Sequence, residues 1–277
     1  MPKRRGAADW PFNKSYVESW KSFRTHSNEN EVIGSAIQAW LPCKDRKEMR
    51  LLDVGCADGA LIKDLVQEYQ SKINISCVLL EPNEYLLADA TLNLSGVGKV
   101  TSVLPINDSL SPAIIGNIPR PVTFILFSHV AHLVEPRYWN LLLELLNRDS
   151  VLVWIMDSPN SVFSECWSLT AQTYFKRIDK AYKFINALSV RGYSVEAKSA
   201  IVSVNDPFNL PETARSGVLS LLAYDDFDGL PAKKADIIRP IIRKRMVGGK
   251  LSCDISLFQI KKSSASGLNK VGSEEWV

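Results

Sequence analysis

Short apolar runs alternate with helical patterns from residue 49 onward, and this alternation constrains the fold more than any other feature. Five runs have the length and apolar content of buried strands: 49–54, 74–80, 99–105, 122–127 and 150–156. Helical patterns lie between them, as in 137–148, where Tyr138, Leu141, Leu142 and Leu145 share one helical face. Buried strands that alternate with helices predict an α/β fold with a Rossmann-like parallel sheet and helices on both faces.

The segments on either side of this alternation are also patterned. Before it, Ile33, Ile37, Trp40 and Leu41 share one helical face, and Asn28 with Glu31 resembles a capping box, so we expect a helix that ends at Pro42. After it come a helix over 176–193, a strand over 194–204, two helices between Pro211 and Val247, and a strand over 250–260. The predicted organisation is an N-terminal helical region (1–48), one main domain (49–262) and a polar, disordered tail (263–277).

Composition excludes several classes of protein. The 277 residues are 46% hydrophobic, which is ordinary for a soluble globular protein. Their net charge is only +3, so composition does not indicate binding to nucleic acid or to a membrane surface. No apolar segment follows the basic start, and the longest apolar runs are one strand long. The five cysteines lack zinc-ligand spacing, which indicates free thiols, no metal and a reducing, cytoplasmic location.

One short stretch, LLDVGCADGALIKDL at 51–65, predicts a strand, a glycine turn and a helix in succession. Such a turn presents backbone N–H groups at a helix N-terminus, the geometry of the nucleotide-binding half of a doubly wound sheet. Asp53, Gly55 and Gly59 give the pattern D-x-G-x-x-x-G. The dinucleotide fingerprint G-x-G-x-x-G is not met, because Cys56 and Ala57 interrupt it, and a pyrophosphate site is therefore disfavoured.

Polar residues follow the next two predicted strands. Glu81 stands 28 residues after Asp53, at the end of the second strand, where a carboxylate can accept both hydroxyls of a ribose. Asn107 and Asp108 follow the third strand, where they could reach the amino group of adenine. Together these residues predict a nucleoside site without a phosphate. The alternative is that Asp53 caps the turn and Glu81 is a solvated strand end.

This order of elements resembles that of class I S-adenosylmethionine-dependent methyltransferases. The segment YVESWKSFRTHSNENE is, in addition, similar to the opening of the histamine N-methyltransferase family. The likeness continues through the glycine turn, LLEPN, FILFSHVAHLV, SVFSECWSL and LSCDISLFQI. It implies a seven-stranded sheet whose last strand runs antiparallel beside its neighbour, and an N-terminal lid. It also implies S-adenosylmethionine as cofactor, bound by Asp53, Gly55, Asp58, Gly59, Glu81, Asn107, Asp108 and Ser128.

The same resemblance implies the residues that meet the methyl acceptor. They are Glu29, His129 and Asp254, with Phe163 and Trp167 as walls of the pocket. His129 stands where the family has glutamine, and Asp254 stands where it has asparagine, so the acceptor need not be histamine. Other interpretations remain: His129 as a strand-end histidine, Trp167 as core, and Glu29 as part of a helix start. Asp254 lies on the face opposite its apolar strand neighbours, which favours a site.

The expected activity is methyl transfer to a nitrogen of a small molecule, and the alternative is transfer to an oxygen or a carboxylate. An aliphatic amine has a pKa of about 10, so the reacting nitrogen should be heteroaromatic or aryl, or His129 must take its proton. Nucleic-acid amino methylation is disfavoured, because FSHVAHL stands where N-P-P-Y or D-P-P-Y would. The basic run 239–246 is more typical of a solvated helix face. The sequence leaves monomer and dimer open.

Overall fold

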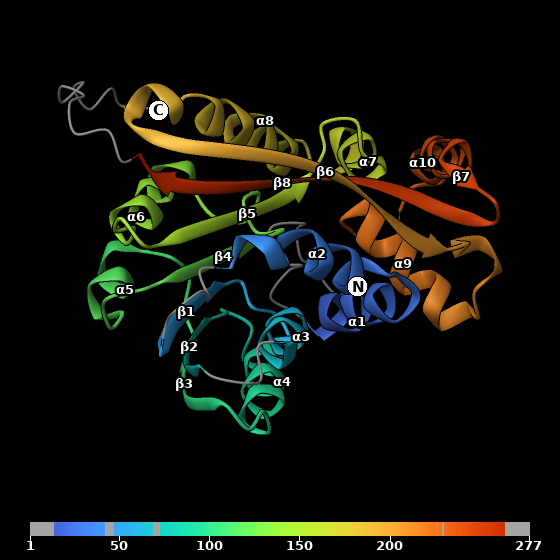
Figure 1. The fold of residues 1–277 in the computed structure, drawn as a ribbon. Helices are drawn as coiled ribbons and strands as arrows, with labels where there is room; N and C mark the ends of the chain where they lie inside the picture. The colour runs from blue at the N-terminus through green and yellow to red at the C-terminus, as the bar shows by residue number, and fades with distance from the viewer. Residues whose placement is uncertain (1–13, 42–46, 69–72, 226, 229, 264–277) are drawn as a thin grey trace. The chain divides into compact units, whose positions relative to one another are not determined.

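The computed structural model describes residues 14–41, 47–68, 73–225, 227–228 and 230–263 (Figure 1). The expectations for Pro42, for Cys43 and for a disordered tail therefore fall on residues outside this set. By its internal contacts the chain divides into two compact units. The sheet unit comprises 33–156, 177–198 and 256–277, and the helical unit comprises 1–32, 157–176 and 199–255.

The central sheet has the strand order β3-β2-β1-β4-β5-β8-β6. Its first five strands all belong to the sheet unit, apart from the last residue of β5: β1 (Glu48–Val54), β2 (Asn74–Leu80), β3 (Val100–Ile106), β4 (Phe124–Ser128) and β5 (Val151–Asp157). They pair in parallel, with Asp53 opposite Leu79 on β2 and Leu126 on β4. The remaining long strands, β6 (Tyr193–Asn205) and β8 (Lys250–Lys262), each contribute residues to both units.

The expected antiparallel last strand is present. Figure 1 shows β8 running in the opposite direction to β5, its neighbour in the sheet. The sheet has one strand more than expected, because β7 (Met246–Val247) pairs antiparallel with the first residues of β8. Gly248 and Gly249 connect the two, both with positive φ, which is the backbone that a tight hairpin turn requires.

Helices connect the parallel strands of the sheet unit. They are α3 (Ala60–Glu68), α4 (Glu84–Ser95), α5 (Pro112–Asn117) and α6 (Trp139–Glu144), and α8 (Gln172–Asn186) continues into this unit from residue 177. All seven residues of β5 are buried, as expected for a parallel strand covered on both faces. Trp154 of β5 packs edge-to-face against Phe127 and Trp139, with ring centroids 4.6 and 5.4 Å away. These contacts pack β4, β5 and α6 together.

The helical unit contains α1 (Lys14–His26), α7 (Val162–Thr170), α9 (Glu212–Ala223) and α10 (Ala232–Lys244). The expected N-terminal helix is present as α2 (Glu29–Ile37) and the 3₁₀ turn η2 (Gln38–Trp40), and its apolar face is buried. Asn28 precedes α2 as predicted, yet its Oδ1 accepts the N–H of Ser203, 2.7 Å away. The capping-box interpretation was therefore wrong: this side chain joins the start of α2 to β6.

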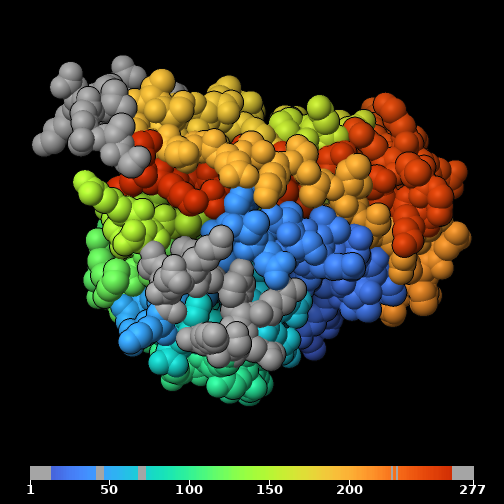
Figure 2. All heavy atoms as spheres, in the orientation of Figure 1, coloured from blue at the N-terminus to red at the C-terminus, as the bar shows by residue number. Residues whose placement is uncertain are grey.

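The basic run at 239–246 lies at the end of α10 and in β7, at the right of Figure 2. Arg239 and Arg243 are exposed, and their guanidinium groups lie over the rings of Phe227 and Phe208, 5.8 and 5.3 Å from the centroids. The two arginines therefore lie on the outer, solvated face of α10, where their stems and guanidinium groups cover aromatic rings of the helical unit.

Four cysteines, Cys56, Cys77, Cys166 and Cys253, are buried free thiols. No helix among the described residues is both long enough and apolar enough to cross a membrane. In the same part of the chain, histidine, cysteine and acidic side chains nowhere gather in a group of three or more that could hold a metal ion.

Candidate active site

The glycine turn after β1 is held by backbone contacts with β2. The N–H groups of Gly55 and Cys56 point to the carbonyl of Leu80, 2.7 and 3.4 Å away. Gly55 and Gly59 both have φ of 71°, and Ala57 between them has φ of 48°. Three left-handed residues in five reverse the chain sharply, and two of the three are glycines because only glycine adopts this backbone without strain.

Gly55 is required by packing inside the protein. A Cβ built on it would stand 2.1 Å from Cγ1 of Val130, and a Cβ on Gly59 would stand 3.0 Å from the Cα of Ala90. Both glycines were predicted to bind the cofactor, and no pattern in the sequence indicated their contacts with Val130 and Ala90. The turn is pressed against the segment that follows β4 on one side and against α4 on the other.

Asp58 and Asn93 stabilise the second half of the turn. Asp58 Oδ1 accepts the N–H of Ala60 at 3.0 Å, at the start of α3, and Asn93 Nδ2 donates to the carbonyl of Asp58 at 2.9 Å. The side chain of Asp58, a predicted cofactor residue, therefore acts locally as a helix-start acceptor. Asn93 is a supporting residue that no short-range pattern in the sequence could reveal.

Glu81, at the carboxyl end of β2, is joined to the glycine turn. Its Oε2 accepts the N–H of Ala57 at 3.1 Å and its Oε1 accepts the N–H of Asn83 at 2.9 Å. The residue is only 8% exposed, which rules out the alternative of a solvated strand end. Burial raises the pKa of the carboxyl, and the two backbone N–H groups partly offset this by stabilising the carboxylate.

Asp53 is buried at the end of β1, 3% exposed. Burial raises its pKa well above the ordinary range, and the nearby charges of Glu81 and Asp58 raise it further. The turn N–H groups of Gly55, Ala57 and Gly59 are taken by Leu80, Glu81 and Cys56, so Asp53 does not cap the turn. Its buried carboxyl lies instead within reach of the charges of Glu81 and Asp58.

Asn107 extends this arrangement to the end of β3. Its Nδ2 donates to the carbonyls of Glu81 and Pro82, both 3.1 Å away. Asp108 is exposed, and its Oδ1 accepts the N–H of Ser109 at 2.7 Å. The structure thus brings the turn, Glu81 and Asn107 into one hydrogen-bonded edge across three adjacent strands.

Ser128 and His129 follow at the end of β4. Ser128 pairs with Ile155 of β5, and the N–H of His129 donates to the carbonyl of Ile155 at 2.9 Å. Both side chains are half-buried. His129 has φ of 53°, a left-handed backbone that a non-glycine residue adopts at a cost of about 1–2 kcal/mol. The chain therefore leaves the sheet abruptly at the predicted base.

The other predicted acceptor residues belong to the helical unit. Glu29 begins α2, and its Oε2 lies 3.5 Å from a guanidinium nitrogen of Arg24, with both side chains largely buried. Burial raises the pKa of the Cys253 thiol, and the nearby negative charges of Asp157, Glu29 and Asp254 raise it further. Glu29 and Asp254 therefore lie in the same neighbourhood within this unit.

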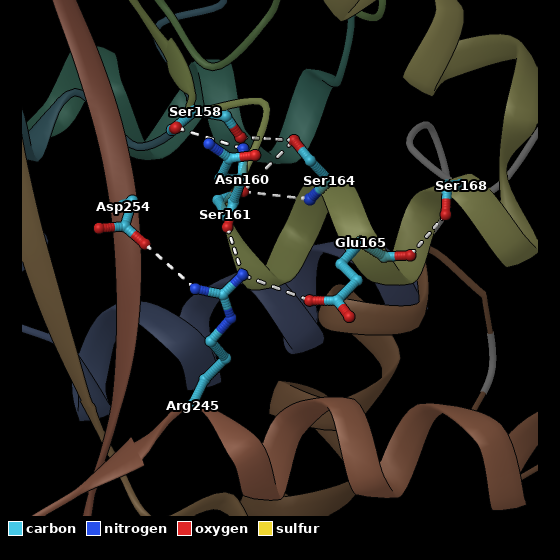
Figure 3. A network of polar contacts seen from close by, with 8 residues as sticks. All are labelled: Ser158, Asn160, Ser161, Ser164, Glu165, Ser168, Arg245 and Asp254. Atoms are coloured by element: carbon cyan, nitrogen blue, oxygen red, sulfur yellow. Dashed lines mark hydrogen bonds and ion pairs between the residues drawn. The ribbon is translucent and has the colours of Figure 1, made fainter.

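Asp254 lies in a polar network around Arg245 (Figure 3). A guanidinium nitrogen of Arg245 is 3.8 Å from Asp254 Oδ2, and the other is 3.4 Å from Glu165 Oε2 and 2.7 Å from the carbonyl of Asn160. The predicted alternation holds, since Asp254 is half-exposed between buried neighbours on β8. The arginine was not foreseen, and it supplies the partner that a mid-strand acid needs.

Phe163 and Trp167 are neighbours on α7, 6% and 3% exposed. Their ring centroids are 5.7 Å apart, Phe163 also packs on Phe23, and Trp167 packs on Tyr224. Trp167 Nε1 donates to the carbonyl of Leu221 at 3.4 Å. These contacts make both rings part of an aromatic core in the helical unit. The convergence of these residues with His129 on one acceptor stays a prediction.

No protein-family model matches the chain, and no curated protein matches it in sequence. Solved structures do match. The YcgJ protein from Bacillus subtilis is 12% identical with a TM-score of 0.55, over 83% of this chain and 98% of that one. The plantazolicin methyltransferase BamL, in complex with a triazolic desmethylPZN analog and SAH, is 14% identical with a TM-score of 0.53.

BamL is matched over 92% of this chain and 94% of its own. The plantazolicin methyltransferase BpumL, with the same kinds of ligand, is 12% identical with a TM-score of 0.52 and the same coverage. The histamine N-methyltransferase family is not shown by these comparisons. Likeness at such identities establishes the fold alone, and the chain has the Rossmann-like α/β fold of these methyltransferases.

Proposed function

We propose that this protein transfers a methyl group from S-adenosylmethionine to a nitrogen of a small molecule. The observation that carries the cofactor part of the proposal is the buried carboxylate of Glu81, held by Ala57 of the glycine turn and by Asn83. The fold neighbours BamL and BpumL, which were solved with SAH, support the choice of cofactor. The alternative acceptor atoms are an oxygen and a carboxylate.

The residues at this edge fit the nucleoside part of the cofactor chemically. Each oxygen of Glu81 accepts one backbone N–H and keeps a second lone pair, so the carboxylate can accept both ribose hydroxyls without giving up its own contacts. Asn107 uses its amide nitrogen on Glu81 and Pro82, which leaves its amide oxygen as the acceptor for an adenine amino group. Asp58 adds negative charge beside the turn, where a ligand ammonium or sulfonium would be stabilised, and such a cation would also favour the ionised form of the buried Asp53 carboxyl.

The cofactor, when bound, supplies an activated methyl on a sulfonium. The residues of this chain position the acceptor in line with that methyl, and positioning accounts for most of the catalysis. His129 is the proposed base. Its imidazole stands at the carboxyl end of β4, and it would take the proton from an acceptor nitrogen at neutral pH.

Glu29 and Asp254 are the proposed contacts for a second, non-reacting part of the acceptor. Each already has an arginine partner, Arg24 and Arg245 respectively, so neither presents a bare negative charge. A cationic group on the acceptor would share these carboxylates with the arginines. We therefore propose that Glu29 and Asp254 orient the acceptor mainly by hydrogen bonding, with Phe163 and Trp167 as the apolar surface beneath it.

Calorimetry with SAH tests the cofactor half of this proposal on the full chain. Saturable binding at micromolar concentration is expected, and its absence at millimolar SAH would overturn the proposal. The acceptor half is tested by incubating the protein with methyl-labelled S-adenosylmethionine and fractionated small-molecule extract. Mass spectrometry of the labelled product then tells nitrogen from oxygen or carboxylate methylation.

A further inference from the structure

The segment after β4 forms a short, hydrogen-bonded turn, residues 129–134. The carbonyl of Val130 accepts the N–H groups of Leu133 and Val134, at 2.9 and 3.0 Å. The turn begins at the left-handed backbone of His129 and places Val130 against Gly55. One short turn therefore carries the proposed base and also packs on the turn proposed to hold the cofactor.

Arg177 of α8 binds the far end of this turn. One guanidinium nitrogen, Nη1, donates to the carbonyls of His132 and Leu133, both at 3.1 Å. A cationic donor that bonds two carbonyls makes charge-assisted hydrogen bonds, and His132 at this end of the turn is only 5% exposed. Arg177 and the turn both belong to the sheet unit. Arg177 lies 44 residues after Leu133 in the sequence.

We propose that Arg177 is a positioning residue for methyl transfer, acting by holding the 129–134 turn so that His129 and Val130 keep their places beside the glycine turn. This inference rests on the proposed function. The strained backbone of His129 gives the reason: left-handed residues persist only where surrounding contacts hold them. The two charge-assisted hydrogen bonds from Arg177 are such contacts. Without them the turn can relax, and the base moves away from the acceptor.

The test compares Arg177→Met, which keeps an unbranched apolar stem but no donor, with Arg177→Lys, which keeps one cationic donor group. Lys180→Met is the matched control, because Lys180 is an exposed residue of the same helix. Hydrogen exchange of the free protein is measured first. In Arg177→Met we expect the amides of Leu133 and Val134 to exchange at least tenfold faster than in wild type, with partial rescue in Arg177→Lys and no change in Lys180→Met.

Kinetics and SAH binding then distinguish a positioning role in catalysis from a general contribution of Arg177 to the stability of the protein. For Arg177→Met we expect kcat on the identified acceptor to fall about tenfold, with the KM for S-adenosylmethionine within threefold of wild type. Unchanged exchange at Leu133 and Val134, or faster exchange throughout α8, would overturn the inference. If wild type binds no SAH, the proposed function fails, and exchange in the free protein still decides whether Arg177 holds the turn. If Arg177→Met does not fold, the same measurements compare Arg177→Lys with wild type.

Discussion

Glu81 Oε2 accepts the N–H of Ala57 across a gap of 24 residues in sequence. This one hydrogen bond joins the end of β2 to the glycine turn after β1, so the acid and the turn are held together before any ligand arrives. Preorganisation of this kind reduces the ordering cost of binding. A change at Glu81 therefore removes a structural contact together with the proposed binding contact.

Glu81→Gln should weaken SAH binding by about 30-fold, roughly 2 kcal/mol, because an amide can replace one acceptor contact but not the charge-assisted pair to a ribose. Glu84→Gln is the control: it removes the same charge three residues away on the exposed start of α4. Calorimetry measures both. Equal affinities for the two variants would contradict the role of Glu81.

Asp53→Asn should make the ligand-free protein more stable at high pH. Burial raises the pKa of Asp53, so the folded protein keeps a proton that the unfolded chain releases above about pH 4. Stability of the wild type is therefore fully present below pH 4 and falls as the pH rises toward the folded-state pKa. Asparagine has no proton to lose.

The expected result for Asp53→Asn is a Tm about 5 °C higher than wild type at pH 8 and no difference near pH 4. Asp64→Asn, on the exposed face of α3, should show neither effect. Thermal melts followed by circular dichroism give both values. A Tm difference that does not depend on pH would show that ionisation of Asp53 is not its cause.

Gly55→Ala should destabilise the protein by about 2–4 kcal/mol, since the new Cβ meets Val130 and the residue must keep a positive φ. Combining it with Val130→Ala should recover part of the loss, which a double-mutant cycle in urea measures. Gly96→Ala is the control, because nothing lies within 4 Å of a Cβ at that position. Additive effects of the two changes would mean that the contact between positions 55 and 130 is unimportant.

His129→Ala should lower kcat by about 100-fold if the imidazole moves a proton, and far less if it only orients the acceptor. Raising the pH should recover the activity of the variant in the first case, because the acceptor then loses its proton to solvent. SAH affinity should stay within threefold of wild type. Steady-state kinetics between pH 6 and pH 9 provides the test, and wild-type kcat throughout would remove His129 from the mechanism.

Asp254→Asn and Glu29→Gln should mainly raise the KM of the acceptor and leave SAH affinity unchanged. Glu165→Gln is the matched control for Asp254, because both acids contact Arg245 but only Asp254 is a proposed acceptor residue. If Glu165→Gln raises the KM as much as Asp254→Asn does, the effect comes from Arg245 and not from a direct contact with the acceptor.

Much of the fold could be predicted because local pattern determines it. The strand predicted at 74–80 coincides with β2, and the others differ by one or two residues at their ends. Alternating exposure along β8 followed from period-two counting, since a strand that is buried on one face has that period. The prediction failed at Asn28, where a distant partner, Ser203, competes with the local cap for the same oxygen.

The candidate site was harder to predict than the fold. Sequence order placed Glu81 and Asn107 at strand ends, and the structure connects them directly. The partners of the site residues come from far along the chain, as Arg245 does for Glu165 at 80 residues' separation. Such contacts depend on packing, for which a single sequence carries no periodic signal, so the arginine partners of Glu29 and Asp254 could not be foreseen.

The division into two units has a practical consequence for protein production. The chain passes between the units five times, at residues 32–33, 156–157, 176–177, 198–199 and 255–256, so neither unit is one contiguous stretch. A fragment that ends at residue 156 would lack β8, the strand beside β5 in the sheet. It would present β5, all of whose residues are buried in the whole chain, as an open apolar edge that invites aggregation. We therefore expect C-terminal truncations that remove β8 to aggregate more than chains that retain it.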